Sequence, residues 1–222
     1  MGRPDQRLLM TRVLVVRHGE TDWNLHGRMQ GWAPVPLNRT GREQADAVGR
    51  YLAREYDVDR VVASDLHRAR ETTEHVTAHV DAPVTYDRAW RERHLGVYQG
   101  LEYEDVVERF PAFALGETGI DAADRTPESG ESLLDVRERV VGAWESLVDD
   151  TAEPDAAADD EWETVLVVAH GGPIHLLLGH LKGMDARASL REHSQSNCAV
   201  NEVRVGGTDA EVVRENDTEW EA

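Results

Sequence analysis

Two short segments of this chain place a histidine and a glycine directly behind an apolar run. Arg17-His18-Gly19 follows Val13-Leu14-Val15-Val16, and His170-Gly171-Gly172 follows Val165-Leu166-Val167-Val168-Ala169. Apolar runs of this length that end near glycine are typical of buried strands, and open α/β folds build their sites at the carboxyl edge of the sheet. The matched context predicts that the two imidazoles meet at one edge.

The chemistry open to His18 depends on the charges around it. A neutral imidazole can act as a base, a metal ligand or a nucleophile. Arg17 is its neighbour, and Arg68 stands near the start of the helix expected after the next strand. Guanidinium groups bind phosphate oxygens well and repel divalent cations. The surroundings therefore favour a phosphoryl acceptor, and we expect no metal here.

Alternating strand and helix signals predict an α/β fold, a three-layer sandwich with a largely parallel central sheet. Thr40 with Glu43 predicts a capping box, and Ser64-Asp65 predicts the cap of the following helix. The expected strands are 13–16, 61–63, 83–86, 165–169, 199–205 and 211–214. The expected helices are 41–56, the segment after Ser64-Asp65 to about Val80, 102–110, 133–148 and 173–181.

The length of 222 residues, without an internal repeat, fits a single domain. We expect a flexible extension over 1–10 and one domain over 11–216. Residues 114–131 contain three glycines and a proline and are expected to form a flap over the site. The acidic stretch 149–163 is expected to be a solvated loop.

The charge balance is strongly acidic. With 43 acidic and 24 basic residues the formal net charge is −19, which argues against nucleic acid or an anionic membrane as a partner. Lys182 is the only lysine, so the other 23 basic residues are arginines. Because carboxylates keep a protein hydrated in concentrated salt, a halophilic source is our hypothesis. The alternative is an acidic protein from a genome biased toward arginine codons.

The cellular compartment is predicted from what the sequence lacks. No apolar stretch approaches the ~20 residues of a membrane helix, and residues 1–10 contain no signal-peptide core. Cys198 is the only cysteine, which excludes an internal disulfide and a cysteine-based zinc site. We expect a soluble, cytoplasmic protein, and a homodimer is compatible with the sequence.

Four motifs together resemble the histidine phosphatase superfamily, which includes cofactor-dependent phosphoglycerate mutases and broad-specificity phosphatases. They stand in the family's order and cover residues 12 to about 205. The motifs are Arg17-His18-Gly19-Glu20-Thr21-x-Trp23-Asn24 with Arg28-Met29-Gln30-Gly31-Trp32 and Leu37-Asn38-x-Thr40-Gly41, then Ser64-Asp65-Leu66-His67-Arg68-Ala69, Arg91-Glu92-Arg93-His94-Leu95-Gly96 and Ala169-His170-Gly171-Gly172.

The resemblance implies a phosphoglycerate mutase-like fold and a role for each matching residue. His18 corresponds to the nucleophile that becomes phosphohistidine, and Glu92 to the acid that protonates the leaving oxygen. The residues that correspond to the phosphoryl pocket are Arg17, Arg68 and His170. The residues at substrate-binding positions are Asn24, Gln30, Gly31 and Gly171. The implied partner is a phosphorylated small molecule, with no cofactor.

The resemblance leaves two activities open. Mutases of the family carry a longer insertion with paired arginines and a proline-rich run. Here residues 101–131 are short, with Arg109 and Arg125 apart from one another. The chain looks like the shorter broad-specificity phosphatases, so we predict phosphomonoester hydrolysis, with a phosphoglycerate mutase as the alternative. A second alternative is a non-catalytic module that binds a phosphorylated ligand, but binding alone needs no acid.

Several of these residues also have purely structural interpretations. Arg17 and His18 could form a structural pair at a strand end, and His170 could be a core histidine. The role of the acid could fall to a carboxylate other than Glu92, namely Glu102, Glu104 or Glu108. His75 and His79, four apart on an expected helix, have the spacing of a zinc pair. Without an evident third ligand, we interpret them as part of a solvated face.

Overall fold

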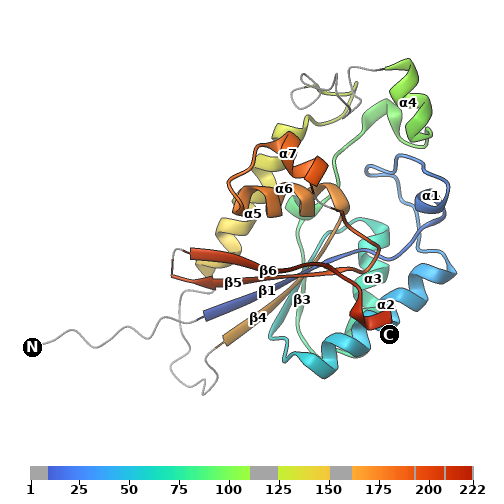
Figure 1. Ribbon diagram of the computed structural model, residues 1–222. Helices are drawn as coiled ribbons and strands as arrows, with labels where there is room; N and C mark the ends of the chain where they lie inside the picture. Colours follow the sequence, from blue (N-terminus) through green and yellow to red (C-terminus); the bar gives the residue numbers. More distant parts are fainter. Residues whose placement is uncertain (1–9, 111–124, 151–161, 193, 208, 222) are drawn as a thin grey trace, which may run out of the picture.

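The computed structural model describes residues 10–110, 125–150, 162–192, 194–207 and 209–221. A six-stranded sheet in the order β3-β2-β4-β1-β5-β6 lies between two layers of helices (Figure 1). The strands are β1 (Met10–Arg17), β2 (Arg60–Ala63), β3 (Val84–Tyr86), β4 (Trp162–Ala169), β5 (Val200–Gly206) and β6 (Asp209–Asp217). The helices are α1 (Asp22–Leu25), α2 (Arg39–Glu55), α3 (His67–Thr77), α4 (Tyr103–Arg109), α5 (Leu133–Asp150), α6 (Gly171–Leu181) and α7 (Ala186–Glu192), with the short 3₁₀ helices η1 (Arg88–Trp90), η2 (Gly96–Tyr98) and η5 (Glu219–Glu221).

The pairing of the strands is mostly parallel, which confirms the predicted fold class. β1 pairs with β4, β4 with β2, and β2 with β3, all in parallel. β5 runs antiparallel to β1, and β6 returns antiparallel to β5. Arg17 is in register with Ala169, so β1 and β4 end side by side. The residues that follow them, His18 and His170, therefore begin at the same edge of the sheet.

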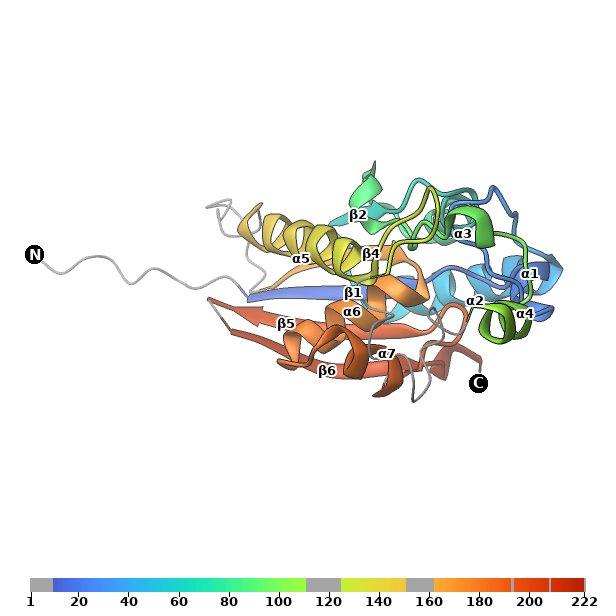
Figure 2. The same cartoon turned by 90° about the horizontal axis from the view of Figure 1, so that it is seen from above.

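The apolar runs of β1 and β4 are continuous because both faces of these strands are covered. Successive side chains of a strand point to opposite faces. Val13 and Val15 pack in the core under α5 and α6, while Leu14 and Val16 pack in the core with α2 and α3. Figure 2, seen from above, shows α5 over the β2–β4 side of the sheet and α7 over the β5–β6 side. The central strands are thereby fixed from both sides.

Helix α2 begins earlier than the capping box at Thr40 predicts, and that prediction is wrong. Its N-cap is Asn38, whose side-chain oxygen accepts a hydrogen bond from the Gly41 amide at 2.8 Å. Both Asn and Thr can cap a helix, and Asn is the stronger N-cap. The helix therefore starts at Arg39 and includes Thr40 in its first turn.

The predicted cap of α3 is also wrong, because both of its residues have partners elsewhere. The N-cap is Leu66, without a side-chain cap. Asp65 instead accepts two hydrogen bonds from Arg91, at 2.5 and 2.6 Å. The Ser64 hydroxyl lies 2.8 Å from Nε2 of His170. The helix ends at Thr77, before the expected end at Val80.

Some predicted boundaries change, and others lie outside the described residues. Met10 is the first residue of β1 and not part of an extension, Trp162 and Glu163 belong to β4, and residues 149–150 belong to α5. The expected flap and acidic loop fall largely on residues 111–124 and 151–161, outside the described ranges. Helices α1 and α7 are absent from the helices that the sequence predicts. None of the helices in the described ranges has both the length and the hydrophobicity needed to cross a membrane.

Candidate active site

The two histidines lie together at the carboxyl edge of β1 and β4. Their ring centroids are 5.1 Å apart, and both side chains are buried. The His18 amide donates to the Ala169 carbonyl at 3.0 Å, which extends the pairing of the two strands by one residue. The edge of the sheet therefore holds two imidazoles in contact.

The hydrogen bonds of His18 define which ring nitrogen is free to react. Nδ1 lies 2.7 Å from the Gly19 carbonyl, which can only accept, so Nδ1 carries the proton. Nε2 accepts from Nε of Arg68 at 3.1 Å. Burial, reinforced by the charges of Arg68 and Arg17, holds the pKa of His18 well below its usual 6.5. His18 is thus a neutral imidazole with its lone pair on Nε2.

The two arginines are held in different ways. Arg68 is almost fully buried, and its Nη2 donates to the Gly31 carbonyl at 2.9 Å. Burial lowers the pKa of Arg68 to about 10, which still leaves it charged at neutral pH. Nη1 of Arg17 donates to the Gln195 carbonyl at 2.5 Å. Main-chain carbonyls thus orient both guanidinium groups beside His18.

Two buried nitrogen atoms near His18 have no hydrogen-bond partner among the described residues: Nε of Arg17 and Nδ1 of His170. A buried polar group left unpaired costs about 1–3 kcal/mol, so such atoms indicate the place of a ligand. The guanidinium N–H can only donate. A group rich in acceptor oxygens, such as a phosphoryl group, matches this requirement.

The Glu92 carboxylate faces the same edge. Oε2 accepts from the Gly172 amide at 3.2 Å, and Oε1 from the Arg93 amide at 2.8 Å. The negative charge of Glu92 also raises the pKa values of Arg17 and Arg68 against the effect of burial, which places it close to both. A Cβ atom at Gly172 would overlap this carboxylate. Gly172 is therefore a site residue that the sequence did not assign, although it stood in the quoted motif.

The three competing carboxylates belong to the α4 region and have no comparable position. Glu102 is the N-cap residue of α4, and its carboxylate lies 3.6 Å from Arg28 at the surface. Glu104 and Glu108 lie on α4 and are exposed. The geometry thus favours Glu92 as the acid.

The residues predicted to make neutral contacts have different surroundings. Gln30 is buried, and its Oε1 has no hydrogen-bond partner in the described part of the chain. Gly31 supplies the carbonyl that orients Arg68, and Gly171 opens α6 with Nε of Arg17 nearby. Asn24 uses its side-chain oxygen to accept from the Thr21 amide at 3.2 Å, within the cap of α1. Its contact with substrate stays a prediction.

No group of three metal-binding side chains that could hold an ion occurs within the residues the structure describes. His75 and His79 both face Asp46, with nitrogen–oxygen distances of 3.1 and 3.6 Å. Both histidines thus share the Asp46 carboxylate of α2, a contact that the sequence did not reveal.

The loop before β5 holds the main chain of Arg17 and His18, and the sequence analysis did not identify it. Nδ2 of Asn197 donates to the His18 carbonyl at 2.9 Å, and the Cys198 amide donates to the Arg17 carbonyl at 3.1 Å. From another element, Thr72 accepts from the Gly19 amide at 3.0 Å. No local pattern marks these residues, because each acts on a segment more than 50 positions away.

The fold and the site define an α/β protein with two imidazoles and two arginines gathered at the carboxyl edge of its sheet. The profile of the histidine phosphatase superfamily (branch 1) matches residues 13–218. The chain belongs to this superfamily, and it is a phosphatase.

Three similar proteins illustrate the relationship. Phosphoglycerate mutase-like protein 4 of Arabidopsis thaliana is 38% identical over 74% of this chain and 68% of its own. Glucosyl-3-phosphoglycerate phosphatase of Mycolicibacterium vanbaalenii is 36% identical over 78% of this chain and 75% of its own. The solved structure named mycobacterial hydrolase 1 is 30% identical, covers 94% of this chain and 99% of its own, and superposes with a TM-score of 0.82.

Proposed function

We propose that this phosphatase hydrolyses phosphomonoesters of small metabolites through a phosphohistidine formed on His18. The observation that carries the proposal is the buried, neutral His18, whose Nε2 lone pair lies beside Arg17, Arg68 and His170. Phosphoryl transfer requires mainly positioning and fixed positive charge around the transferred group. The cluster supplies both without a metal ion.

In the first step, Nε2 of His18 attacks phosphorus in line with the leaving oxygen. The bond between phosphorus and that oxygen breaks while Glu92 gives it a proton. The guanidinium groups, with the amino end of α6, stabilise the charge on the three equatorial oxygens. The Gly19 carbonyl keeps the proton on Nδ1 and stabilises the positive charge that the ring acquires.

In the second step, water attacks the phosphohistidine. The Glu92 carboxylate takes a proton from the water, the bond between phosphorus and Nε2 breaks, and His18 returns to its neutral form. Inorganic phosphate leaves. Glu92 therefore alternates between acid and base, as microscopic reversibility requires.

The substrate class is an alkyl phosphate of a metabolite, and the alternative is a mutase reaction. The relative named glucosyl-3-phosphoglycerate phosphatase supports hydrolysis of a phosphorylated sugar derivative. The separation of Arg109 and Arg125 departs from the paired arginines of the mutases, and Arg109 lies 4.0 Å from Asp105 on its own helix. A second alternative is a module that binds a phosphorylated ligand without catalysis. Binding alone needs no acid, so this alternative gives no reason for Glu92 at the site.

The test of this function compares hydrolysis with isomerisation. We expect the protein, assayed in EDTA, to release inorganic phosphate from a panel of alkyl phosphomonoesters and to leave 3-phosphoglycerate without isomerisation to 2-phosphoglycerate. EDTA is included because the arginines and His170 supply the charge that a metal would bring. Isomerisation faster than phosphate release would identify a mutase, and loss of hydrolysis restored by Mg²⁺ or Zn²⁺ would contradict the assigned site.

We also propose that the protein is adapted to concentrated salt. With 43 acidic and 24 basic residues, the folded chain repels itself. Ions screen this repulsion strongly at 1 M salt, where the Debye length is about 3 Å, and weakly at ~0.01 M, where it is about 30 Å. We expect the melting temperature to rise as potassium chloride increases from ~0.05 to ~3 M. Sucrose is the uncharged control. A melting temperature independent of potassium chloride would remove the proposal.

The cytoplasmic location and the homodimer are proposals as well. The single cysteine, Cys198, is buried and free, which suits a reducing compartment. The net charge of −19 argues against nucleic acid or an anionic membrane as a partner. Sedimentation of the purified protein measures the oligomeric state.

A further inference from the structure

Arg139 on α5 uses its whole guanidinium group to hold the segment that carries Glu92. Nη1 donates to the carbonyls of Ala89 and Arg91, both at 2.7 Å, and Nη2 donates to the Glu92 carbonyl at 2.9 Å. Nε and Nη2 also donate to the two carboxylate oxygens of Glu131, at 3.0 and 3.1 Å. These bonds occupy all five N–H groups that an arginine side chain offers.

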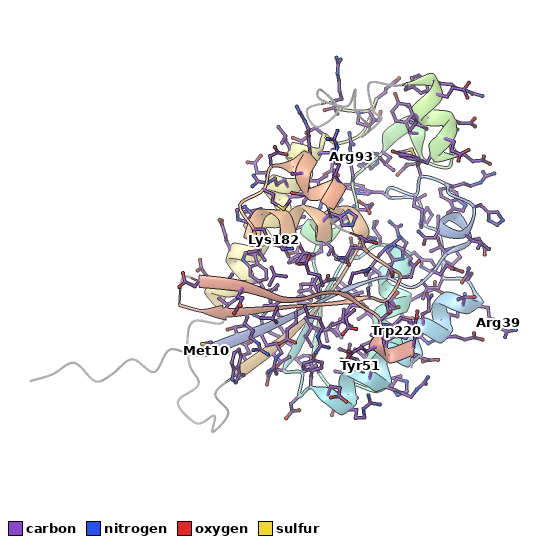
Figure 3. All side chains as sticks on the ribbon, viewed as in Figure 1. Met10, Arg39, Tyr51, Arg93, Lys182 and Trp220 are labelled. Carbon is purple, nitrogen blue, oxygen red and sulfur yellow. The ribbon has the colours of Figure 1, made fainter. Side chains whose placement is uncertain are left out.

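Glu131 binds the residues that follow Glu92 in the chain, just as Arg139 binds Glu92 and the residues before it. Its Oε2 accepts from the His94 amide at 2.8 Å, and its own carbonyl accepts from Nε of Arg93 at 2.8 Å. Figure 3 labels Arg93, the next residue after Glu92, on the side of the sheet covered by α5 and α6. The main chain on both sides of the proton donor is thus fixed by one ion pair, Arg139 with Glu131.

Arg139 of this ion pair lies on helix α5, which is anchored in the core. Val136 and Val140, on either side of Arg139 along α5, are fully buried in the core above β1 and β4. The side chain of Arg139 is only 19% exposed, which limits screening of the pair by water. Sites supported from helices anchored in the core are held more precisely than sites carried by loops alone.

We propose that Arg139, with Glu131, is the positioning residue of the proton donor. It sets the distance from the Glu92 carboxylate to the leaving oxygen and does not itself touch the substrate. The inference rests on the proposed function, because it requires Glu92 to act as the acid. A displacement of about 1 Å at a reacting group can cost about a hundredfold in rate.

The Arg139→Lys variant distinguishes the effect of the hydrogen bonds of Arg139 from the effect of its positive charge. Arg139 also contributes positive charge near His170, where it helps to lower the pKa of that imidazole. Lysine keeps the charge, but its three donors sit on one nitrogen and cannot reach three carbonyls and a carboxylate together. An effect of Arg139→Lys therefore reports the lost geometry.

The experiment compares alkyl and aryl phosphates in Arg139→Lys. We expect kcat on an alkyl phosphate to fall by about 10- to 100-fold and kcat on para-nitrophenyl phosphate by less than about threefold, because the aryl leaving group needs no proton. Arg60→Lys is the matched control: Arg60 donates to Glu163 at 2.9 Å and to the Leu147 carbonyl at 3.2 Å, at the opposite end of the sheet. It should leave the ratio of the two rates unchanged.

A double variant distinguishes failure of this inference from failure of the proposed function. If Arg139 acts through Glu92, Arg139→Lys adds little to the loss already caused by Glu92→Gln. If Glu92→Gln shows the selective loss while Arg139→Lys lowers both substrates equally, Arg139 is only a fold contact and the inference is wrong. If the parent enzyme forms no phosphoenzyme, the proposed function is wrong, and the inference that rests on it is wrong as well. Glu131→Gln, which keeps the side-chain shape, should show the same selectivity and serves if Arg139→Lys does not fold.

Discussion

The His18→Ala variant is expected to lose turnover completely, together with any acid-labile phosphoenzyme. The Nε2 lone pair of His18 is the proposed nucleophile, and the neighbouring imidazole of His170 has its Nε2 next to the Ser64 hydroxyl. We expect no neighbouring side chain to replace this nitrogen as an in-line nucleophile. Rapid acid and alkaline quenching of enzyme mixed with ³²P-labelled phosphomonoester measures the phosphoenzyme directly.

His75→Ala is the matched control for this variant. His75 lies on α3 and pairs with Asp46 at 3.1 Å, away from the sheet edge, so its loss should leave the phosphoenzyme intact. The pH dependence of phosphoenzyme formation in the parent protein is a second test of the role of His18. Because the pKa of His18 is held well below 6.5, phosphoenzyme formation should persist at pH values at which a free histidine is already protonated. Substantial hydrolysis by pure His18→Ala protein would contradict the covalent mechanism.

The Glu92→Gln variant is expected to lose about 10²- to 10⁴-fold in kcat/KM on alkyl phosphates and far less on para-nitrophenyl phosphate. Glutamine keeps the size of the side chain, and its one oxygen can accept from either the Gly172 amide or the Arg93 amide but not from both. It has no proton to give to an alkoxide. The measurement is the ratio of the losses on the two substrates, determined in the same preparation.

Glu102→Gln is the control for this second variant. Glu102 lies at the surface, 3.6 Å from Arg28, and its replacement should leave both rates unchanged. If Glu92→Gln instead lowers both substrates equally, Glu92 positions phosphate or supports the loop. The acid must then be sought among the carboxylates of the α4 region, Glu102, Glu104 and Glu108.

The sequence alone determined the layers of the fold and the position of both histidines along it. The apolar runs before His18 and His170 predict buried strands, and strands covered by helices on both faces must be apolar throughout. Parallel strands deliver their last residues to one edge, so the meeting of two imidazoles could be expected before their distance was known. The order of the motifs supported the family, which the profile over residues 13–218 shows.

Only the tertiary structure decided what each polar side chain binds. Asn38 rather than Thr40 caps α2, and Ser64 lies against His170 instead of capping α3. An Nη2 donor of Arg139 and the amide of Gly172 bond Glu92 from positions about 50 and 80 residues away along the chain. Periodicity reports which side of an element is buried, because burial repeats along the chain. A hydrogen bond between distant segments leaves no such repeat, so its partners are fixed only when the sheet and its two helical layers close around them.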